Sequence, residues 1–466
     1  MHVVFVSSEV FPYAKTGGLG DVCGTLPLAL EKQGLRVSIV LPRYKIVDPG
    51  KFRLERIHRL AWHTTLGKKI DVYLIESERF FSREGLYGYS GGDYQDNLER
   101  FHYFCLKTLE LFKILKKRVD IFHAHDWQAA LVPILLRSVF KNDSFYRETR
   151  SAQTVHNLAY QGVFPKSQFS SLGLAKNVYS IYGLEYFEQI NLLKGGIIYS
   201  DRVTTVSPQY AKEIQTPRFG CGLEGVLRSR KEGVLGILNG LDTEIWNPET
   251  DGFIDAVYSR KNLQDKVLDK TALQKELGFT VNPSVPLMGF VGRLTPQKGL
   301  ELIRSAFDKI LKWEIQLVFL GIGEEKYQRL LKQTAARHPK KVAARLRFSE
   351  EAAHRVYAGC DLFLMPSTYE PCGLSQMISL RYGTIPLVFK TGGLADTVTP
   401  FDARSGTGFV FDRYNETSFI KAFHDALTAF KNKKVFREAM LRGMSCDFSW
   451  QRSAKEYMKL YDALMR

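Results

Sequence analysis

Short apolar runs of strand type alternate with helical stretches along the whole chain. In the first half, runs rich in β-branched and aromatic residues cover 3–8, 36–42, 70–77, 119–125, 151–157 and 202–207. Between several of them, apolar residues recur at helical spacing, as at 21–34 and 97–117. Strands that alternate with helices predict a parallel sheet covered by helices on both faces.

The second half repeats this pattern. Its runs of buried-strand type cover 285–293, 315–323, 344–349, 361–367 and 384–389, with helical stretches such as 300–313 and 324–338 between them. The length of 466 residues also exceeds one ordinary core, since domains of roughly 100 to 250 residues are typical. We therefore predict an α/β fold of two doubly wound, Rossmann-like lobes.

The stretch 243–253 interrupts the rhythm with Pro, Gly and Asp, and we expect the two lobes to join there. Ligands of open α/β sheets bind at the carboxyl ends of the strands. With two such lobes, the cleft between them is the expected site.

The composition also indicates where in the cell the protein is expected. No stretch of about 18 uncharged apolar residues could span a bilayer, and the first residues read as a strand and not as a signal peptide. The six cysteines are scattered, without a C-x-x-C pair, which is typical of reduced thiols. We expect a cytoplasmic protein with no membrane partner.

The net charge of +16 raises the question of nucleic acid. Basic clusters at 113–117, 337–341 and 431–434 fall in helical or loop contexts and do not interleave with exposed aromatic residues. A positive field that attracts a small phosphorylated substrate is the more economical interpretation. We expect no nucleic-acid partner.

Two similar glycine-rich stretches, KTGGLGDV at 15–22 and KTGGLADTV at 390–398, stand far apart in the chain. Lys15 follows the first strand, and Gly17 and Gly18 allow the backbone to approach a ligand before a helix begins. Unpaired N–H groups at a helix start, with a lysine beside them, favour an anion. The alternative is a tight turn with a solvated lysine.

Two further loops follow predicted strands of the second half. Arg293 and Lys298 place two cations where a diphosphate could bind, although a charged loop is the plain alternative. Glu370 precedes a turn made by Pro371 and Gly373. Its carboxylate could accept hydrogen bonds from sugar hydroxyls or stabilise positive charge in a transition state, and helix capping is the alternative.

His125, Asp126 and His156 stand at the ends of two predicted strands of the first half. Such residues can ligate zinc, but a role in holding a sugar is favoured, and we expect no metal. The chain contains no G-x-S-x-G elbow, Walker-type loop or dinucleotide fingerprint. Spacing alone thus predicts loops that converge on an anionic ligand and does not name the reaction.

Several stretches together resemble bacterial glycogen synthases and plant starch synthases. They follow one another in that family's order over nearly the whole chain: SSEVFPYAKTGGLGDV, HAHDWQAAL, TVHNLAYQGVF, LNGLDTEIWNPETD, VGRLTPQKG, STYEPCGLSQM and KTGGLADTV. The resemblance implies a retaining glucosyltransferase of GT-B type. Such enzymes move glucose from ADP-glucose, in bacteria, to the non-reducing-end 4-hydroxyl of glycogen or another α-1,4-glucan.

The resemblance also implies a division of the chain. It places an acceptor-side lobe at 1–245, a nucleotide-sugar lobe at 246–447 and a last helix at 448–466 that packs back on the first lobe. It implies no cofactor and no metal, because preorganised cations can stabilise the departing diphosphate.

The resemblance also assigns roles to individual residues, at the positions of this sequence that match the family's motifs. The resemblance implies that Lys15 reaches the donor from the opposite lobe, that Arg293 and Lys298 hold the diphosphate, and that Glu370 lies near the transferred glucose. It places His156 as a further catalytic residue. The implied substrate contacts are Lys15, Gly17, Gly18, Asp21, Asp126, Asn157, Asn239, Phe348, Cys372, Gly373, Thr391, Gly392 and Gly393. Phe348 would lie against adenine, where the family often has tyrosine.

Alternatives stay open for the reaction mechanism and for the sugar donor. The sequence offers no carboxylate pair of the kind that retaining glycosidases use, and the family's favoured route is front-face attack assisted by the departing phosphate. Ile378 stands where many GT-B enzymes have a second glutamate, which weakens a sucrose-synthase-like interpretation. UDP-glucose stays possible as the donor. A catalytically silent glucan-binding or nucleotide-binding module should have lost Lys15, Arg293, Lys298 or Glu370, and all four are present.

Overall fold

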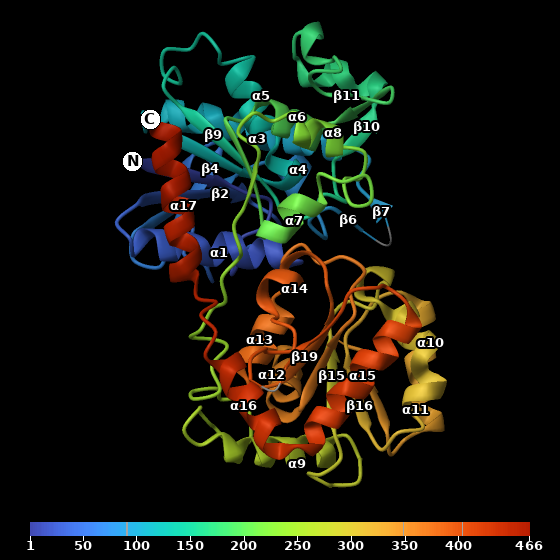
Figure 1. The fold of residues 1–466 in the computed structure, drawn as a ribbon. Helices are drawn as coiled ribbons and strands as arrows, with labels where there is room; N and C mark the ends of the chain where they lie inside the picture. The colour runs from blue at the N-terminus through green and yellow to red at the C-terminus, as the bar shows by residue number, and fades with distance from the viewer. Residues whose placement is uncertain (90–91, 348, 403) are drawn as a thin grey trace. The chain divides into compact units, whose positions relative to one another are not determined.

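The computed structural model describes residues 1–89, 92–347, 349–402 and 404–466. The chain divides into two compact units, one of Met1–Gly240 with Trp450–Arg466 and the other of Leu241–Ser449. In Figure 1 the first unit runs from blue to green and includes the red C-terminal helix. Within the described ranges, no helix is long and apolar enough to cross a membrane.

The first unit is built on a nine-stranded sheet with the order β14-β13-β9-β8-β1-β2-β5-β4-β3. Its strands are β1 (His2–Val6), β2 (Arg36–Pro42), β3 (Glu55–His58), β4 (Ala61–Leu66), β5 (Ile70–Ile75), β8 (Ile121–His125), β9 (Arg150–Val155), β13 (Arg202–Thr205) and β14 (Val234–Gly236). The strands from β14 to β5 run parallel, whereas β4 and β3 pair antiparallel at one edge. Fully buried β1 and β8 form the centre, and the apolar run of β8 is interrupted by the buried His123 and His125.

Helices of the first unit follow its strands. They are α1 (Gly18–Glu31), α2 (Glu78–Phe81), α3 (Asn97–Ile114), α4 (Asp126–Ala129), α5 (Leu131–Arg137), α6 (Leu192–Tyr199), α7 (Pro208–Glu213), α8 (Glu224–Arg228) and α17 (Trp450–Met465), with 3-10 turns at Lys166–Leu172 and Lys176–Val178. Small ladders join β6 (Gly88–Tyr89) to β7 (Gly92–Asp93), and β10 (Val163–Pro165) to β12 (Gln189–Asn191) and β11 (Glu185–Tyr186).

The last helix, α17, belongs to the first unit although it closes the chain. It packs against α1 and buries Tyr457 and Tyr461, which are one helical turn apart (Figure 1). The Tyr461 hydroxyl lies 2.7 Å from Nδ1 of His123 in β8. This helix therefore anchors the chain's end to the centre of the first sheet.

The second unit has a six-stranded parallel sheet with the order β17-β16-β15-β18-β19-β20. Its strands are β15 (Leu287–Val291), β16 (Gln316–Leu320), β17 (Val342–Arg345), β18 (Leu362–Met365), β19 (Ile385–Phe389) and β20 (Phe409–Phe411). Its helices are α9 (Lys266–Glu276), α10 (Leu300–Ile310), α11 (Glu325–Arg337), α12 (Glu350–Gly359), α13 (Ser375–Arg381), α14 (Gly392–Thr397), α15 (Glu416–Lys431) and α16 (Lys433–Met444), with 3-10 turns at Leu263–Asp265 and Pro296–Lys298.

The predicted α/β fold is confirmed, with departures in detail; the short edge strands β14 and β20, for example, were not predicted. The hairpin of β3 and β4 was not predicted from the sequence, since its polar, half-exposed strands lack a continuous apolar run. The run predicted as a strand at 344–349 begins earlier, at Val342, and ends at Arg345. Ser349 instead caps α12, because its hydroxyl accepts a hydrogen bond from the Ala352 N–H at 3.2 Å.

Each sheet has a point where the chain reverses its direction of growth across the sheet. This point lies between β1 and β8 in the first unit and between β15 and β18 in the second. Loops that leave neighbouring strands at such a point diverge and leave a crevice at the carboxyl ends of the strands. The segments that follow these four strands are therefore the first place to look for a site.

Candidate active site

A partly buried ion pair lies at the switch point of the second unit. Lys298 ends the turn that follows β15, and Glu370 follows β18. The Lys298 Nζ donates to Glu370 Oε2 at 2.6 Å, and the Ser367 hydroxyl donates to the same oxygen at 3.0 Å. The side chains are 18% and 8% exposed, so the pair is held mostly away from bulk water. The structure thus brings together two of the predicted site residues.

The loops that carry this pair are locked to one another. Gly299 has φ +77, and a Cβ added there would lie 2.0 Å from the Pro366 carbonyl oxygen. The Thr368 N–H donates to the Gln297 carbonyl at 2.8 Å. Because the backbones meet this closely, the positions of Lys298 and Glu370 are fixed relative to each other.

A third loop, after β19, packs beneath Glu370. The Gly393 N–H donates to the Glu370 carbonyl at 3.0 Å. Added Cβ atoms at Gly392 and Gly393 would lie 2.0 and 1.9 Å from the carbonyl oxygens of Glu370 and Cys372. The predicted residues Cys372, Gly373, Thr391, Gly392 and Gly393 therefore share one cluster of loops with Glu370.

Arg293 stands apart from this network. It is exposed at the end of β15, and within the described ranges its guanidinium has neither a hydrogen-bond nor an ion-pair partner. A cation in this state can meet an anionic ligand without breaking a protein contact. Phe348, the residue predicted to face adenine, lies outside the described residues.

In the first unit, the first K-T-G-G stretch forms an exposed start to α1. Lys15 Nζ lies 2.6 Å from Asp21 Oδ1, with side chains 39% and 31% exposed. Added Cβ atoms at Gly17 and Gly18 would meet no atom within 4 Å. The protein's own packing therefore does not require glycine here, which is consistent with space kept for a ligand.

Sequence reasoning missed the carboxylate that holds this stretch in place. Glu9 is 4% exposed, and its Oε1 and Oε2 accept from the hydroxyl and the N–H of Thr16, both at 2.6 Å. It also accepts from the Gly17 N–H at 3.1 Å and from the Tyr87 hydroxyl at 2.6 Å. Its place shortly after the first strand was the available signal, since switch-point loops carry site residues.

Asp126, His156 and His125 meet at the carboxyl ends of β8 and β9. Asp126 has φ +56, an uncommon conformation for a residue other than glycine, and its Oδ1 accepts from the His156 N–H at 2.7 Å. Burial raises the pKa of Asp126 to about 7 and lowers the pKa of His156 to about 3. His156 is therefore a neutral imidazole, with Nε2 2.9 Å from Nδ1 of His125.

Two predicted amides also lie in the first unit. Asn239 is 6% exposed, and among the described residues its Oδ1 has no hydrogen-bond partner. Asn157 is half-buried, and its Oδ1 accepts from the Ala159 N–H at 3.1 Å. An unpaired buried carbonyl oxygen is costly, so Asn239 has capacity for a ligand hydroxyl.

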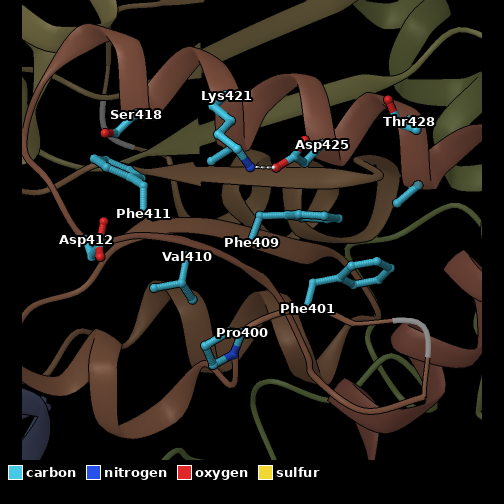
Figure 2. A pocket seen from close by; sticks show the side chains of 12 residues that line it. Pro400, Phe401, Phe409, Val410, Phe411, Asp412, Ser418, Lys421, Asp425 and Thr428 are labelled. Atoms are coloured by element: carbon cyan, nitrogen blue, oxygen red, sulfur yellow. Dashed lines mark hydrogen bonds and ion pairs between the residues drawn. The ribbon is translucent and has the colours of Figure 1, made fainter.

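A cavity of about 580 Å³ lies elsewhere in the second unit, beside the edge strand β20. Figure 2 shows Phe401 and Phe409 side by side in it, with the Lys421 and Asp425 ion pair of α15 at its rim. Its lining contains none of the predicted site residues. The cavity therefore gives no support to any of the predicted contacts.

Comparison with known proteins defines the class. Residues 2–229 match the family model described as starch synthase catalytic domain, and residues 274–440 match that of glycosyl transferases group 1. With its two doubly wound sheets, the chain is therefore a glycosyltransferase of the two-domain, GT-B type.

Full-length relatives narrow the class. The chain is 48% identical to a glycogen synthase of Anaeromyxobacter sp. over 100% of this chain and 99% of that protein, and 45% identical to one of Thermotoga maritima over 99% and 98%. It is 36% identical to the catalytic domain of starch synthase IV from Arabidopsis thaliana bound to ADP and acarbose, with a TM-score of 0.90 and coverage of 100% and 99%. The chain belongs to the glycogen synthase and starch synthase family.

Proposed function

We propose that the protein transfers glucose from ADP-glucose to the non-reducing-end 4-hydroxyl of an α-1,4-glucan such as glycogen, with retention of configuration. The observation that carries the proposal is the pair of Lys298 and Glu370, 2.6 Å apart at the switch point of the second sheet. Further support comes from the similar starch synthase, whose structure holds ADP and acarbose.

The diphosphate is assigned to Lys298 and Arg293. Breaking the bond between glucose and the diphosphate leaves more negative charge on the β-phosphate, so cations placed beside it favour the transition state. Arg293 is exposed and presents a planar fork suited to phosphate oxygens. Lys298 adds a point charge that Glu370 holds in place.

Glu370 is assigned to the transferred glucose. One of its oxygens, Oε2, accepts from both Lys298 and Ser367. Its Oε1 is then available for a sugar hydroxyl or for the positive charge that develops on the anomeric carbon. The backbone of Cys372, Gly373, Thr391, Gly392 and Gly393 supports this carboxylate and supplies further polar groups to the donor.

The bond changes follow a front-face course. The bond from C1 of glucose to the β-phosphate oxygen breaks, and its electron pair leaves with ADP. The acceptor 4-oxygen then forms a bond to C1 on the same face, and its proton passes to the departing phosphate oxygen. In this course Glu370, held by Lys298 and Ser367, stabilises charge and does not act as the nucleophile of a double displacement. No metal or cofactor takes part in these steps.

The first unit is assigned chiefly to the acceptor. Asp126, His156 and Asn239 supply buried polar groups suited to sugar hydroxyls, the half-buried Asn157 supplies another, and His156 presents a neutral imidazole. Lys15, with Asp21, Gly17 and Gly18, is assigned as a further contact to the donor phosphate.

The donor is tested with purified protein, glycogen and either labelled ADP-glucose or labelled UDP-glucose. The proposal requires incorporation from ADP-glucose at a rate well above that from UDP-glucose. Preferred use of UDP-glucose would reverse the donor assignment and keep the reaction, while incorporation from neither donor by folded protein would contradict the reaction itself.

A further inference from the structure

Three potential metal ligands lie together beneath the proposed acceptor site. Cys23 lies on α1, His125 ends β8 and His156 follows β9. One ligand atom from each lies within 4.8 Å of the others. Cys23 and His125 are 0% exposed and His156 is 9% exposed, so the cluster is closed except on the side of His156.

One donor atom in this cluster has no partner within the described part of the protein. His125 Nε2 is buried and, among the described residues, has no hydrogen-bond partner. An unpaired buried nitrogen beside a thiol is a costly arrangement that a bound ion would relieve.

We propose that Cys23, His125 and His156 form a binding site for a zinc-type transition-metal ion, and that the bound ion inhibits glucosyl transfer by holding His156. The inhibitory part rests on the proposed role of His156 in the reaction, whereas the binding part does not. A thiolate and two imidazoles suit zinc and leave a fourth, tetrahedral position for water.

The geometry requires a modest contraction. Zinc bonds of about 2.0 to 2.3 Å place tetrahedral ligands roughly 3.3 to 3.7 Å apart. The most distant ligand atoms must therefore approach by up to about 1.1 to 1.5 Å, while the two imidazole nitrogens now 2.9 Å apart must separate slightly or His125 must bind through Nε2. Rotation of the partly exposed His156 ring supplies this movement and an entry path for the ion.

The surroundings favour a cation. The carboxylates of Glu9 and Asp126 lie close enough to Cys23 to interact with it electrostatically. Both carboxylates would offset the charge of a bound ion. His123 is adjacent to His125, but its nitrogens already meet the hydroxyls of Tyr461 and Thr154, so it is not counted as a ligand.

Cobalt(II) is the probe, because its absorption reports a thiolate ligand and tetrahedral geometry directly. Titration of the metal-free, reduced full-length protein should give a thiolate-to-cobalt charge-transfer band that saturates at one equivalent. Cys23→Ser should lose that band or bind at least about a hundredfold more weakly, because loss of a ligand costs more than the ten- to hundredfold typical of its outer partners. Cys221→Ser, which removes an exposed thiol, is the matched control and should keep the band.

Glucosyl transfer measured with added Zn²⁺ tests the inhibitory part of the proposal. Cys23 is not among the proposed substrate contacts, so Cys23→Ser, or Cys23→Ala if the serine variant does not fold, should keep basal activity and resist inhibition. Absence of the band, or its persistence in both Cys23 variants, would overturn the site. A band without inhibition would leave the site standing, overturn the inhibitory role and contradict the part assigned to His156.

Discussion

Replacing Lys298 with alanine tests the central ion pair. The side chain donates to Glu370 at 2.6 Å and, in the proposed reaction, to a donor phosphate oxygen. Its loss removes a charge-assisted contact worth roughly 1.5 to 3 kcal/mol, which corresponds to a fall in kcat/KM for ADP-glucose of about 10- to 150-fold.

The same substitution should also lower stability. Glu370, 6% exposed, would keep only the Ser367 hydroxyl as a side-chain partner. Breaking a fully buried pair costs about 3 to 5 kcal/mol, and the partial exposure of Lys298 reduces the expected cost to about 2 to 3 kcal/mol. The double variant with Glu370→Gln should recover much of this loss, because it leaves no uncompensated charge.

Initial-rate kinetics over a range of ADP-glucose concentrations, together with chemical unfolding, measure both effects. Lys390→Ala is the matched control, since Lys390 is the exposed lysine of the second K-T-G-G stretch and no site role is assigned to it. Unchanged donor affinity and unchanged rate in Lys298→Ala would refute the phosphate contact. Equal stability of the single and double variants would refute the importance of the pair.

The remaining predictions concern three other side chains. Glu370→Ala should lower kcat far more than it raises KM for the donor, and turnover within a few-fold of the parent would contradict its role in the transition state. Glu9→Gln should loosen the loop that carries Lys15 and lower kcat/KM by about tenfold at similar global stability, with Tyr87→Phe as a milder control; parent-like kinetics would remove Glu9 from the site. Burial lowers the pKa of Lys266 to about 8 from 10.5, so the unfolded state binds more protons between these values and stability from this group rises with pH. Unfolding measured across that window should therefore show the parent gaining up to about 3 kcal/mol relative to Lys266→Met, and parallel pH profiles would contradict the shift.

The two K-T-G-G stretches show what sequence alone could not supply. In the second, Gly392 and Gly393 are required because the carbonyls of Glu370 and Cys372 press against them. In the first, Gly17 and Gly18 face open space and their loop is tied to Glu9. The same four residue types thus serve internal packing in the second unit, whereas in the first unit they leave room for a ligand.

Periodicity was enough to predict the fold class, because the parallel strands are buried on both sides and read as continuous apolar runs. The antiparallel edge hairpin of β3 and β4 was not predicted, because its strands are partly exposed and lack a continuous apolar run. The sequence pointed to His125 and His156 as possible metal ligands but not to Cys23, because Cys23 lies on another element whose proximity to them depends on strand order. The site assignments and the cytoplasmic location stay predictions.

The most direct measurement of the account's central claim is incorporation of labelled glucose into glycogen from ADP-glucose, with a chelator present, followed by analysis of the new linkage. The account predicts incorporation without added metal and new α-1,4 bonds at non-reducing ends. Folded protein that gives no incorporation, or that forms β-linked product, would contradict it.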